Sequence, residues 1–307
     1  MKRLISITII NLFVSSIGIC QMGYAFGNCF FYTPTVNKND LINNHLVGKV
    51  KTVTTSTYQV KQNFGNPIKG QQTGCKETTN YDNKGNITEC YAYIEKYNSH
   101  TKRKDFTKTL TKKYVYKYDN NGNILEIKEY EGNGNLNITV TRNYDNNGNI
   151  IEETIQCPNM QDVHFTIKNK YNQKGNVEII EQYFRDTNSA TFTTICKYDE
   201  GGALIGICVN DNEHMGNLKM ISKYDNNKNL IENDNGRSDS TTYKYDITGN
   251  LIEQTYDNNR QTKLFKYSNI DKWHNWNSML EDDSKAIIER GVETPQKITE
   301  RTIEYYQ

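Results

Sequence analysis

Several features that define common protein classes are scarce in this chain of 307 residues. It contains 4 prolines and no Gly-X-Y period, which excludes a collagen-like rod. A mean hydropathy of −0.82 and the lack of apolar runs of about 20 residues exclude a bundle of membrane-spanning helices. The net charge of +1 provides no strong field toward nucleic acid or anionic lipid. Regularly spaced Tyr, Ile, Leu and Val argue against full disorder, so a turn-rich β protein remains.

The N-terminal segment has the pattern of a secretory signal. A basic pair precedes the apolar stretch 4–19, and Gly23 and Ala25 place small residues at a cleavage site. We therefore expect residues 1–25 to be a signal peptide and the mature protein to lie in the periplasm or at the cell surface. Lipid attachment at Cys20 is the less favoured alternative, because an isoleucine precedes that cysteine where a small residue is expected.

The cysteines and histidines form no sequence pattern of a metal site or of a fixed disulfide pairing. Six of the 7 cysteines follow the predicted cleavage site, an even number that permits disulfides in an exported protein without fixing their pairing. These six are Cys29, Cys75, Cys90, Cys157, Cys196 and Cys208. Cys75 and Cys90 flank one predicted turn, where a cross-strand bridge is conceivable. No Cys and His residues have the spacing of a zinc site, so we expect no bound metal and no cofactor.

One short unit, Tyr-Asp-x-x-Gly-Asn followed by an apolar residue, recurs through the chain. Most successive copies start 25 to 27 residues apart, which is the signature of a repeat architecture. The seven clear copies start at Tyr81, Tyr118, Tyr144, Tyr171, Tyr198, Tyr224 and Tyr245. Their turn glycines include Gly85, Gly122, Gly148, Gly175 and Gly249, and a degenerate eighth copy spans 270–276.

The chemistry of the unit is that of a β-hairpin turn. Asx side chains bond nearby backbone amides and Gly adopts a left-handed conformation without steric cost, as in a type I turn with a G1 bulge. Alternating stretches such as 113–118 precede the turn and apolar stretches such as 124–127 follow it, so each period accommodates two strands. Lys228 and His274 replace the glycine, and a left-handed residue other than Gly costs about 1 kcal/mol. We expect these two turns to be weaker or differently shaped.

The copies at Tyr118, Tyr144 and Tyr245 resemble the YD repeat of the RHS family almost letter for letter, and the resemblance covers roughly residues 72–276. Short exported bacterial YD-repeat proteins of unknown function are similar. The resemblance implies tandem β-hairpins in a long, twisted antiparallel sheet, which can spiral. In large RHS toxins such a sheet forms a shell around a toxic domain. Eight copies are too few to close a large shell, and no toxin domain of useful size follows them.

The chain divides into a signal at 1–25, a lead-in with an entry strand at 26–71, the repeat array at 72–276, and a C-terminal excursion with a closing strand at 277–307. Within these parts we expect a loop at 61–74, a short helix or long excursion over 279–291, and a strand over 297–306. The fold class is therefore all-β.

Catalysis has no supporting constellation, since the histidines are scattered and no nucleophile elbow is present, so we expect no enzyme. The repeat tyrosines are expected to form a ladder that joins neighbouring units. The weak candidates for ligand binding are the residues of the least regular turn, Trp273, His274, Asn275 and Trp276. Packing in the core is the alternative for the two tryptophans.

The sequence thus predicts an exported, non-enzymatic repeat protein that presents a binding or scaffold surface in the bacterial envelope. A glycan or an envelope protein is the expected partner. The basic and aromatic strand 112–118 is similar to platforms for single-stranded nucleic acid, but export and the neutral charge balance exclude that partner. No integral membrane domain is expected. A structural component of envelope assembly and a remnant of an RHS-type toxin-delivery shell are the alternatives.

Overall fold

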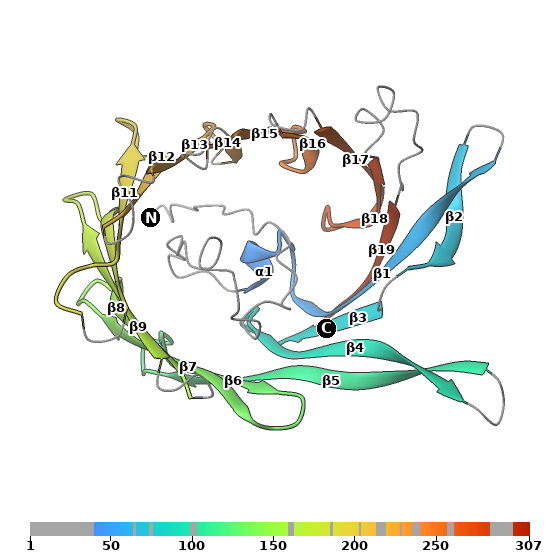
Figure 1. Ribbon diagram of the computed structural model, residues 1–307, viewed down its shortest axis with the longest axis horizontal. Helices are drawn as coiled ribbons and strands as arrows, with labels where there is room; N and C mark the ends of the chain where they lie inside the picture. Colours follow the sequence, from blue (N-terminus) through green and yellow to red (C-terminus); the bar gives the residue numbers. More distant parts are fainter. Residues whose placement is uncertain are drawn as a thin grey trace.

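The protein is a ring of antiparallel strands around a short helix (Figure 1). The computed structural model describes residues 40–63, 66–73, 76–98, 103–158, 163–184, 187–202, 204–212, 219–227, 229–234, 240–256, 261–282 and 297–307. The first elements are α1 (Asp40–Asn43), β1 (Val50–Asn63), β2 (Asn66–Gln72), β3 (Lys76–Tyr81), β4 (Ile87–Asn98), β5 (Arg103–Tyr118), β6 (Ile124–Glu131), β7 (Leu136–Tyr144), β8 (Ile150–Cys157) and β9 (Val163–Tyr171). They are followed by β10 (Val177–Phe184), β11 (Phe192–Tyr198), β12 (Leu204–Asp211), β13 (Lys219–Tyr224), β14 (Leu230–Asp234), β15 (Ser240–Tyr245), β16 (Leu251–Tyr256), β17 (Gln261–Ile270), β18 (Trp276–Asp282) and β19 (Lys297–Tyr305).

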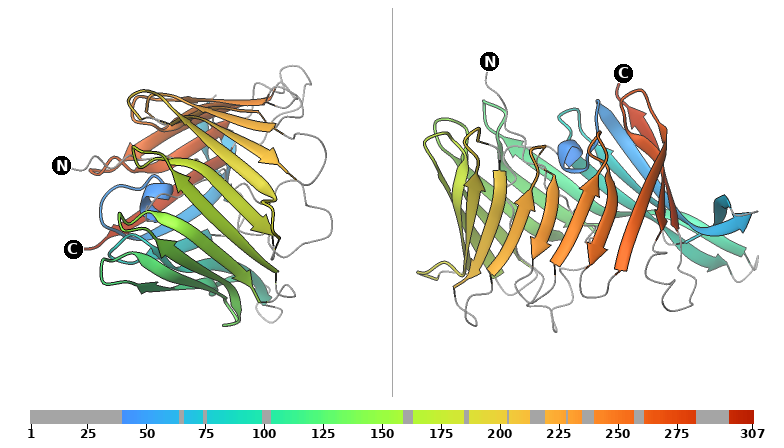
Figure 2. Two further views of the ribbon diagram at one scale, coloured as in Figure 1. Left: turned by 90° about the vertical axis from the view of Figure 1, so that its left-hand side faces the viewer. Right: turned by 90° about the horizontal axis from the view of Figure 1, so that it is seen from above.

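The ring closes at β1, so the long twisted antiparallel sheet that the resemblance implies is a closed barrel and not an open sheet. Residues 50–59 of β1 pair with β19 on one side, and residues 52–55 pair with β3 on the other. Eighteen strands form the resulting barrel, and β2 lies outside it because it pairs with the far end of β1. The strands are inclined to the barrel axis (Figure 2), as closure of a twisted sheet requires. Every copy contributes two strands, so the eight copies supply β3 to β18, and β1 and β19 from outside the array complete the barrel.

The repeat turns have the predicted geometry. In the copy at Tyr118, Gly122 N donates to Asp119 O (3.1 Å), Asp119 N donates to Asn123 O (2.9 Å), and Gly122 has a φ of 85°. Asp119 Oδ1 accepts from the amides of Asn121 and Asn123, while Asn123 Nδ2 donates to Asp119 Oδ2. The Asp and Asn of the unit therefore clamp the turn from both ends. The same two backbone bonds occur in the copies with Gly85, Gly148, Gly175 and Gly249, and the first of them also occurs in the copy with Gly202.

The degenerate eighth copy keeps this turn without glycine. His274 adopts a φ of 67°, and its amide donates to Asp271 O at 3.0 Å, as the repeat glycines do. A different shape for this turn is therefore a wrong expectation, while the energetic cost of a left-handed histidine stays a prediction. Lys228, the other replacement, lies outside the described residues.

Two local expectations need correction. The segment 61–74 contains strand β2 rather than only a loop, because Asn66–Gln72 hydrogen-bonds to the end of β1. Of the short helix or long excursion expected over 279–291, the part as far as Asp282 is a strand, because β18 pairs with both β17 and β19; the rest lies outside the described residues. The expected closing strand over 297–306 is confirmed by β19.

A further turn of the same kind follows Tyr130, which the repeat period does not predict. Gly134 N donates to Glu131 O at 2.9 Å, and Gly134 has a φ of 88°. This turn joins β6 to β7, so it lies at the opposite end of the strands from the turns after Tyr118 and Tyr144. Its position between two regular copies breaks the period that identified the others.

Each strand presents one face to the lumen and one to the outside. On β5, Tyr114 and Tyr116 are half-buried, whereas Val115 and Lys117 are exposed. The hydroxyl of Tyr116 contacts Asp40 of α1 (3.4 Å), which lies inside the ring, so the half-buried face is the inner one. Strand alternation then assigns inner and outer positions around the barrel.

The buried apolar residues form two clusters. The larger comprises Ile167, Val177, Ile180, Cys196, Leu204, Ile207, Val209, Tyr224, Leu230 and Tyr243. The smaller joins α1 and the following turn to the seam of the barrel through Leu41, Leu46, Val50, Val53 and Tyr81. No helix within the described ranges is long and apolar enough to cross a membrane.

Candidate functional site

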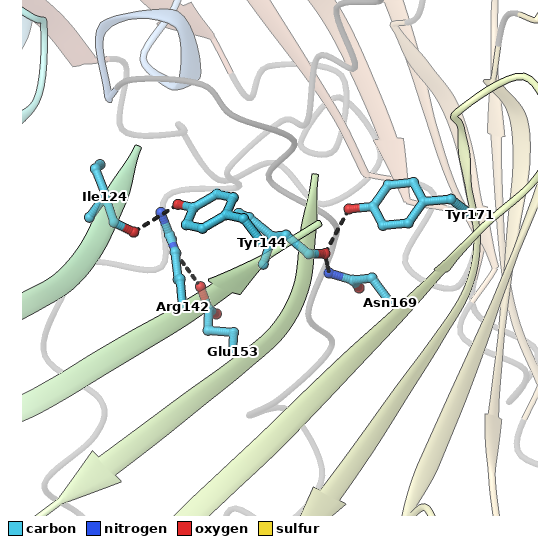
Figure 3. Close-up of polar contacts among 7 residues, drawn as sticks. Ile124, Arg142, Tyr144, Glu153, Asn169 and Tyr171 are labelled. Carbon is cyan, nitrogen blue, oxygen red and sulfur yellow. Dashed lines mark hydrogen bonds and ion pairs between the residues drawn. The ribbon is translucent and has the colours of Figure 1, made fainter. Parts of the chain in front are cut away.

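A belt of tyrosine hydroxyls runs around the inner wall near the repeat turns. The ladder between β6 and β7 starts at Glu126, so the carbonyl of Ile124 lies beyond its end. The hydroxyl of Tyr144 donates to this carbonyl at 2.7 Å and so connects two successive hairpins (Figure 3). Because an unpaired backbone carbonyl inside a protein is costly, the tyrosine supplies the donor that the ladder lacks.

The same bond recurs around the barrel at 2.7 to 2.9 Å. The pairs are Tyr116 to Ile87, Tyr171 to Ile150, Tyr198 to Val177, Tyr245 to Leu230, and Tyr267 to Leu251. At β19 an arginine takes the place of the tyrosine, and Arg301 Nε and Nη2 donate to Trp276 O at 3.0 and 2.8 Å. Hydrogen bonds to backbone carbonyls therefore join the repeats, a role for the tyrosines that the sequence pattern does not reveal.

Helix α1 places a carboxylate against this belt. Leu41 is buried, and its amide donates to Gly85 O at 3.0 Å, which holds α1 to a repeat turn. Asp40 Oδ2 accepts from Ile87 N at 2.6 Å and from the Tyr116 hydroxyl at 3.4 Å. Asp40 belongs to the lead-in 26–71 and is not among the residues that the sequence pattern singles out.

Asp40 lines a cavity of about 240 Å³ between α1 and the inner faces of β4 to β7. Register places its wall in two cross-strand rows, Tyr116–Ile127–Val140 and Tyr114–Glu129–Ile138, and Ile87 completes the wall. Aliphatic side chains make up much of this surface. The polar groups that reach the cavity are two carboxylates and two phenols.

The carboxylate of Glu129 already has a counter-ion. Lys112 Nζ lies 3.0 Å from Glu129 Oε1, and Asn137 Nδ2 donates to the same oxygen at 2.7 Å. Burial, and then the negative charge of Glu129, raise the pKa of Tyr114. The Tyr114 phenol therefore stays protonated and donates a hydrogen bond to Glu129.

The carboxylate of Asp40 is in a different situation. Burial raises its pKa, against the lowering effect of the hydrogen bonds from Ile87 N and Tyr116. Arg142 is close enough to lower this pKa slightly, but it forms its ion pair with Glu153, with Nε 2.6 Å from the carboxylate (Figure 3). Within the described residues, Asp40 has no ion pair of its own.

Two of the four candidates from the least regular turn make contacts that stabilise the barrel. Asn275 is 1% exposed, and its amide group donates to Val47 O and to the Tyr305 hydroxyl, both at 2.8 Å. Trp276 packs under Arg301, whose guanidinium lies 3.3 Å from the ring centroid. Both residues thus connect the turn to the seam of the barrel.

Trp273 and His274 remain partly accessible. Trp273 is 40% exposed and its ring packs at a tilt on Tyr305, with centroids 6.0 Å apart. His274 is exposed at the tip of the turn. The four candidates are neighbours in space, but none of them lines the cavity beside α1.

The thiols offer no reactive centre. Cys90, Cys157, Cys196 and Cys208 are free, while Cys29 and Cys75 lie outside the described residues. Burial raises the pKa of Cys90 to about 11 and that of Cys196 to about 12, which keeps both thiols protonated. Among the side chains that the structure describes, no group of three or more His, Cys, Asp or Glu is placed to hold a metal ion.

Comparison with known proteins yields structural neighbours without a family. No protein family and no curated protein matches this chain. Among solved structures, a porin-like protein from Bacteroides uniformis ATCC 8492 matches 84% of this chain and 98% of its own, with 12% identity and a TM-score of 0.44. A structure of TcdB2-TccC3-Cdc42 matches 71% of this chain and 12% of its own, with 13% identity and a TM-score of 0.32. At these values neither neighbour identifies a function, and the resemblance to the YD repeat stays a prediction.

Proposed function

We propose that this protein is a non-enzymatic binding protein that holds a small ligand in the cavity between α1 and strands β4 to β7. The observation that carries the proposal is the cavity itself, about 240 Å³ in volume, with mainly aliphatic walls and a few convergent polar groups. Ligand sites in proteins are typically concave, mainly apolar and equipped with a small number of placed polar groups. Groups with shifted pKa values, here Asp40 and Tyr114, also gather at such sites.

The outer wall supports a barrel surrounded by water. Lysines that precede the repeat tyrosines form ion pairs across the strands with glutamates of the next strand. These pairs are Lys170–Glu181, Lys223–Glu232 and Lys244–Glu253, with lysine side chains 56%, 52% and 66% exposed. A barrel embedded in lipid instead presents an apolar band outward. The location we propose is the periplasm or the cell surface, on the strength of the predicted signal at 1–25.

A second candidate function, a scaffold in envelope assembly, is favoured by one feature of the outer wall. A row of cross-strand neighbours runs over β10, β11, β12 and β13 and consists of Ile179, Ile195, Cys208 and Ile221. Ile195 is 38% exposed at the centre of this apolar row. Contiguous exposed apolar groups are typical of protein contacts. This candidate predicts a protein partner and no requirement for the inner cavity.

A pair of matched substitutions tests the binding function. Val140→Phe adds a ring to the cavity wall, whereas Val115→Phe makes the same change on the outer face of β5, where the valine is 46% exposed. We expect small apolar fragments, screened by ligand-observed NMR, to bind the wild type and Val115→Phe but not Val140→Phe. A screen without hits, or hits that bind Val140→Phe equally well, would refute the proposal. Unchanged circular dichroism of both variants is the control for folding.

A further inference from the structure

The charges around the cavity select the class of ligand. We propose that the cavity binds a small primary amine, with its ammonium group at Asp40 and a compact ring among the aliphatic side chains. This inference rests on the proposed binding function and narrows it to one chemical class.

The first step is the balance of charge. Glu129 is paired with Lys112 and Glu153 is paired with Arg142, so these four groups contribute no net charge to the cavity. Asp40 remains as a carboxylate without a counter-ion among the described residues, and the nearby Asp82 adds to the negative potential rather than offsetting it. An amine is the ligand whose charge balances this site.

The second step is the geometry of Asp40. Its Oδ2 atom accepts from Ile87 N at 2.6 Å and lies 3.4 Å from the Tyr116 hydroxyl, whose proton goes to Ile87 O, so the carboxylate keeps capacity for further hydrogen bonds. A carboxylate can accept about four hydrogen bonds, and an ammonium group offers three donors. The rings of Tyr114 and Tyr116 line the same cavity, and the face of a tyrosine ring attracts a cation.

The buried charge of Asp40 favours a ligand that can pair with it. Burying a charged group is costly unless it is paired, and burial raises the pKa of Asp40 for that reason. A bound ammonium group would supply the missing pair inside the cavity, where solvent screens the attraction less than at the surface. A neutral alcohol of the same shape would leave the carboxylate without a counter-ion.

Size sets the remaining limit. An apolar cavity of about 150 Å³ accommodates benzene. The present cavity of about 240 Å³ therefore has room for one six-membered ring and an arm of two or three atoms. 2-Phenylethylamine has these dimensions and serves as the probe.

Isothermal titration calorimetry on the full chain tests the inference with three ligands of similar shape, namely 2-phenylethylamine, 2-phenylethanol and 3-phenylpropionate. We expect the amine to bind at least about tenfold more tightly than the alcohol, and the carboxylate not to bind. Asp40→Asn retains an acceptor for Ile87 N, and it should reduce amine affinity at least about tenfold while leaving alcohol binding unchanged. Val140→Phe should abolish binding of the amine and the alcohol.

The outcomes separate the two proposals. Equal binding of amine and alcohol, or an unchanged amine affinity in Asp40→Asn, would overturn the amine assignment and leave the binding cavity standing. No binding of the amine would also overturn it, and the fragment screen would then decide the binding function alone. If Asp40→Asn does not fold, the pH dependence of the wild type replaces it. Protonation of Asp40 at low pH should weaken amine binding and spare alcohol binding.

Discussion

Removal of a single hydroxyl from the tyrosine belt provides a quantitative test of how the repeats are joined. Tyr144→Phe deletes the donor to Ile124 O and leaves the ring in place. Tyr171→Phe makes the same change one repeat further along, at Ile150 O. The two sites differ in their other partners. Asn169 Nδ2 also donates to Ile150 O, at 2.9 Å, whereas at the other site the Arg142 side chain contacts the Tyr144 hydroxyl (Figure 3). Ile124 O accepts from the Tyr144 hydroxyl at 2.7 Å.

This difference sets the expected magnitudes. At Ile124 the substitution removes the tyrosine donor of the carbonyl together with the phenol oxygen that Arg142 contacts, which costs about 1–3 kcal/mol of unfolding free energy. At Ile150 the carbonyl keeps one hydrogen bond, so the loss is that of one net hydrogen bond, about 0.5–1.5 kcal/mol. Tyr144→Phe should therefore destabilise the protein by about 1 kcal/mol more than Tyr171→Phe.

Urea denaturation monitored by circular dichroism measures both free energies. Tyr91→Phe is the control, because the Tyr91 hydroxyl contacts the Glu89 carboxylate on its own strand (2.9 Å), which Asn80 also hydrogen-bonds, and not a backbone carbonyl of a neighbouring hairpin; it should cost less than about 0.5 kcal/mol. Equal losses for Tyr144→Phe and Tyr171→Phe would contradict the reasoning. That result would mean that water reaches Ile124 O and that the belt is not needed to satisfy it.

Three further perturbations have defined outcomes. His274→Gly should raise the unfolding free energy by about 1 kcal/mol, because it relieves a left-handed histidine; a lower melting temperature would count against this. Asp40→Asn should stabilise the ligand-free protein, and the gain should grow as the pH rises above 3.8, the ordinary pKa of an aspartate. The pKa of Asp40 is raised in the folded state, so ionisation of Asp40 at higher pH removes stability from the wild type that the asparagine variant keeps. Melting curves against pH measure this. Truncation after Tyr198 removes β19 and the seam with β1, so circular dichroism should report loss of the folded state, and a stable shorter protein would contradict cooperative closure.

The local structure could be predicted because its causes are local. An Asp that clamps the amide of the Asn four residues later, with a Gly that reaches positive φ, determines each turn from five consecutive residues. Alternation on either side then predicts strands and their two faces. The same signal predicts the inward side of the repeat tyrosines, although not the acceptor that each hydroxyl meets on the neighbouring hairpin.

Closure could not be predicted, because it depends on pairing between distant segments. Residues 50–59 and 297–305 meet across nearly the whole chain, and neither segment contains a pattern that specifies the other as its partner. The cavity depends on the same long-range geometry. Its wall follows from the register of β5, β6 and β7, and its carboxylate comes from a four-residue helix that only the closed barrel can enclose.

The cavity lies at the point in the array where a different tyrosine donates to the backbone carbonyl. In the regular copies the tyrosine that starts the unit donates to the orphaned carbonyl, as Tyr144 does to Ile124. At β5 the hydroxyl of Tyr118 instead contacts Asp82 and accepts from Asn86, and Tyr116 donates to Ile87 O in its place. This change accompanies the longest interval between copies, 37 residues, and it frees the inner wall for Asp40. Irregularity in an otherwise consistent array is where function is expected, because there the sequence retains residues that the fold alone does not require.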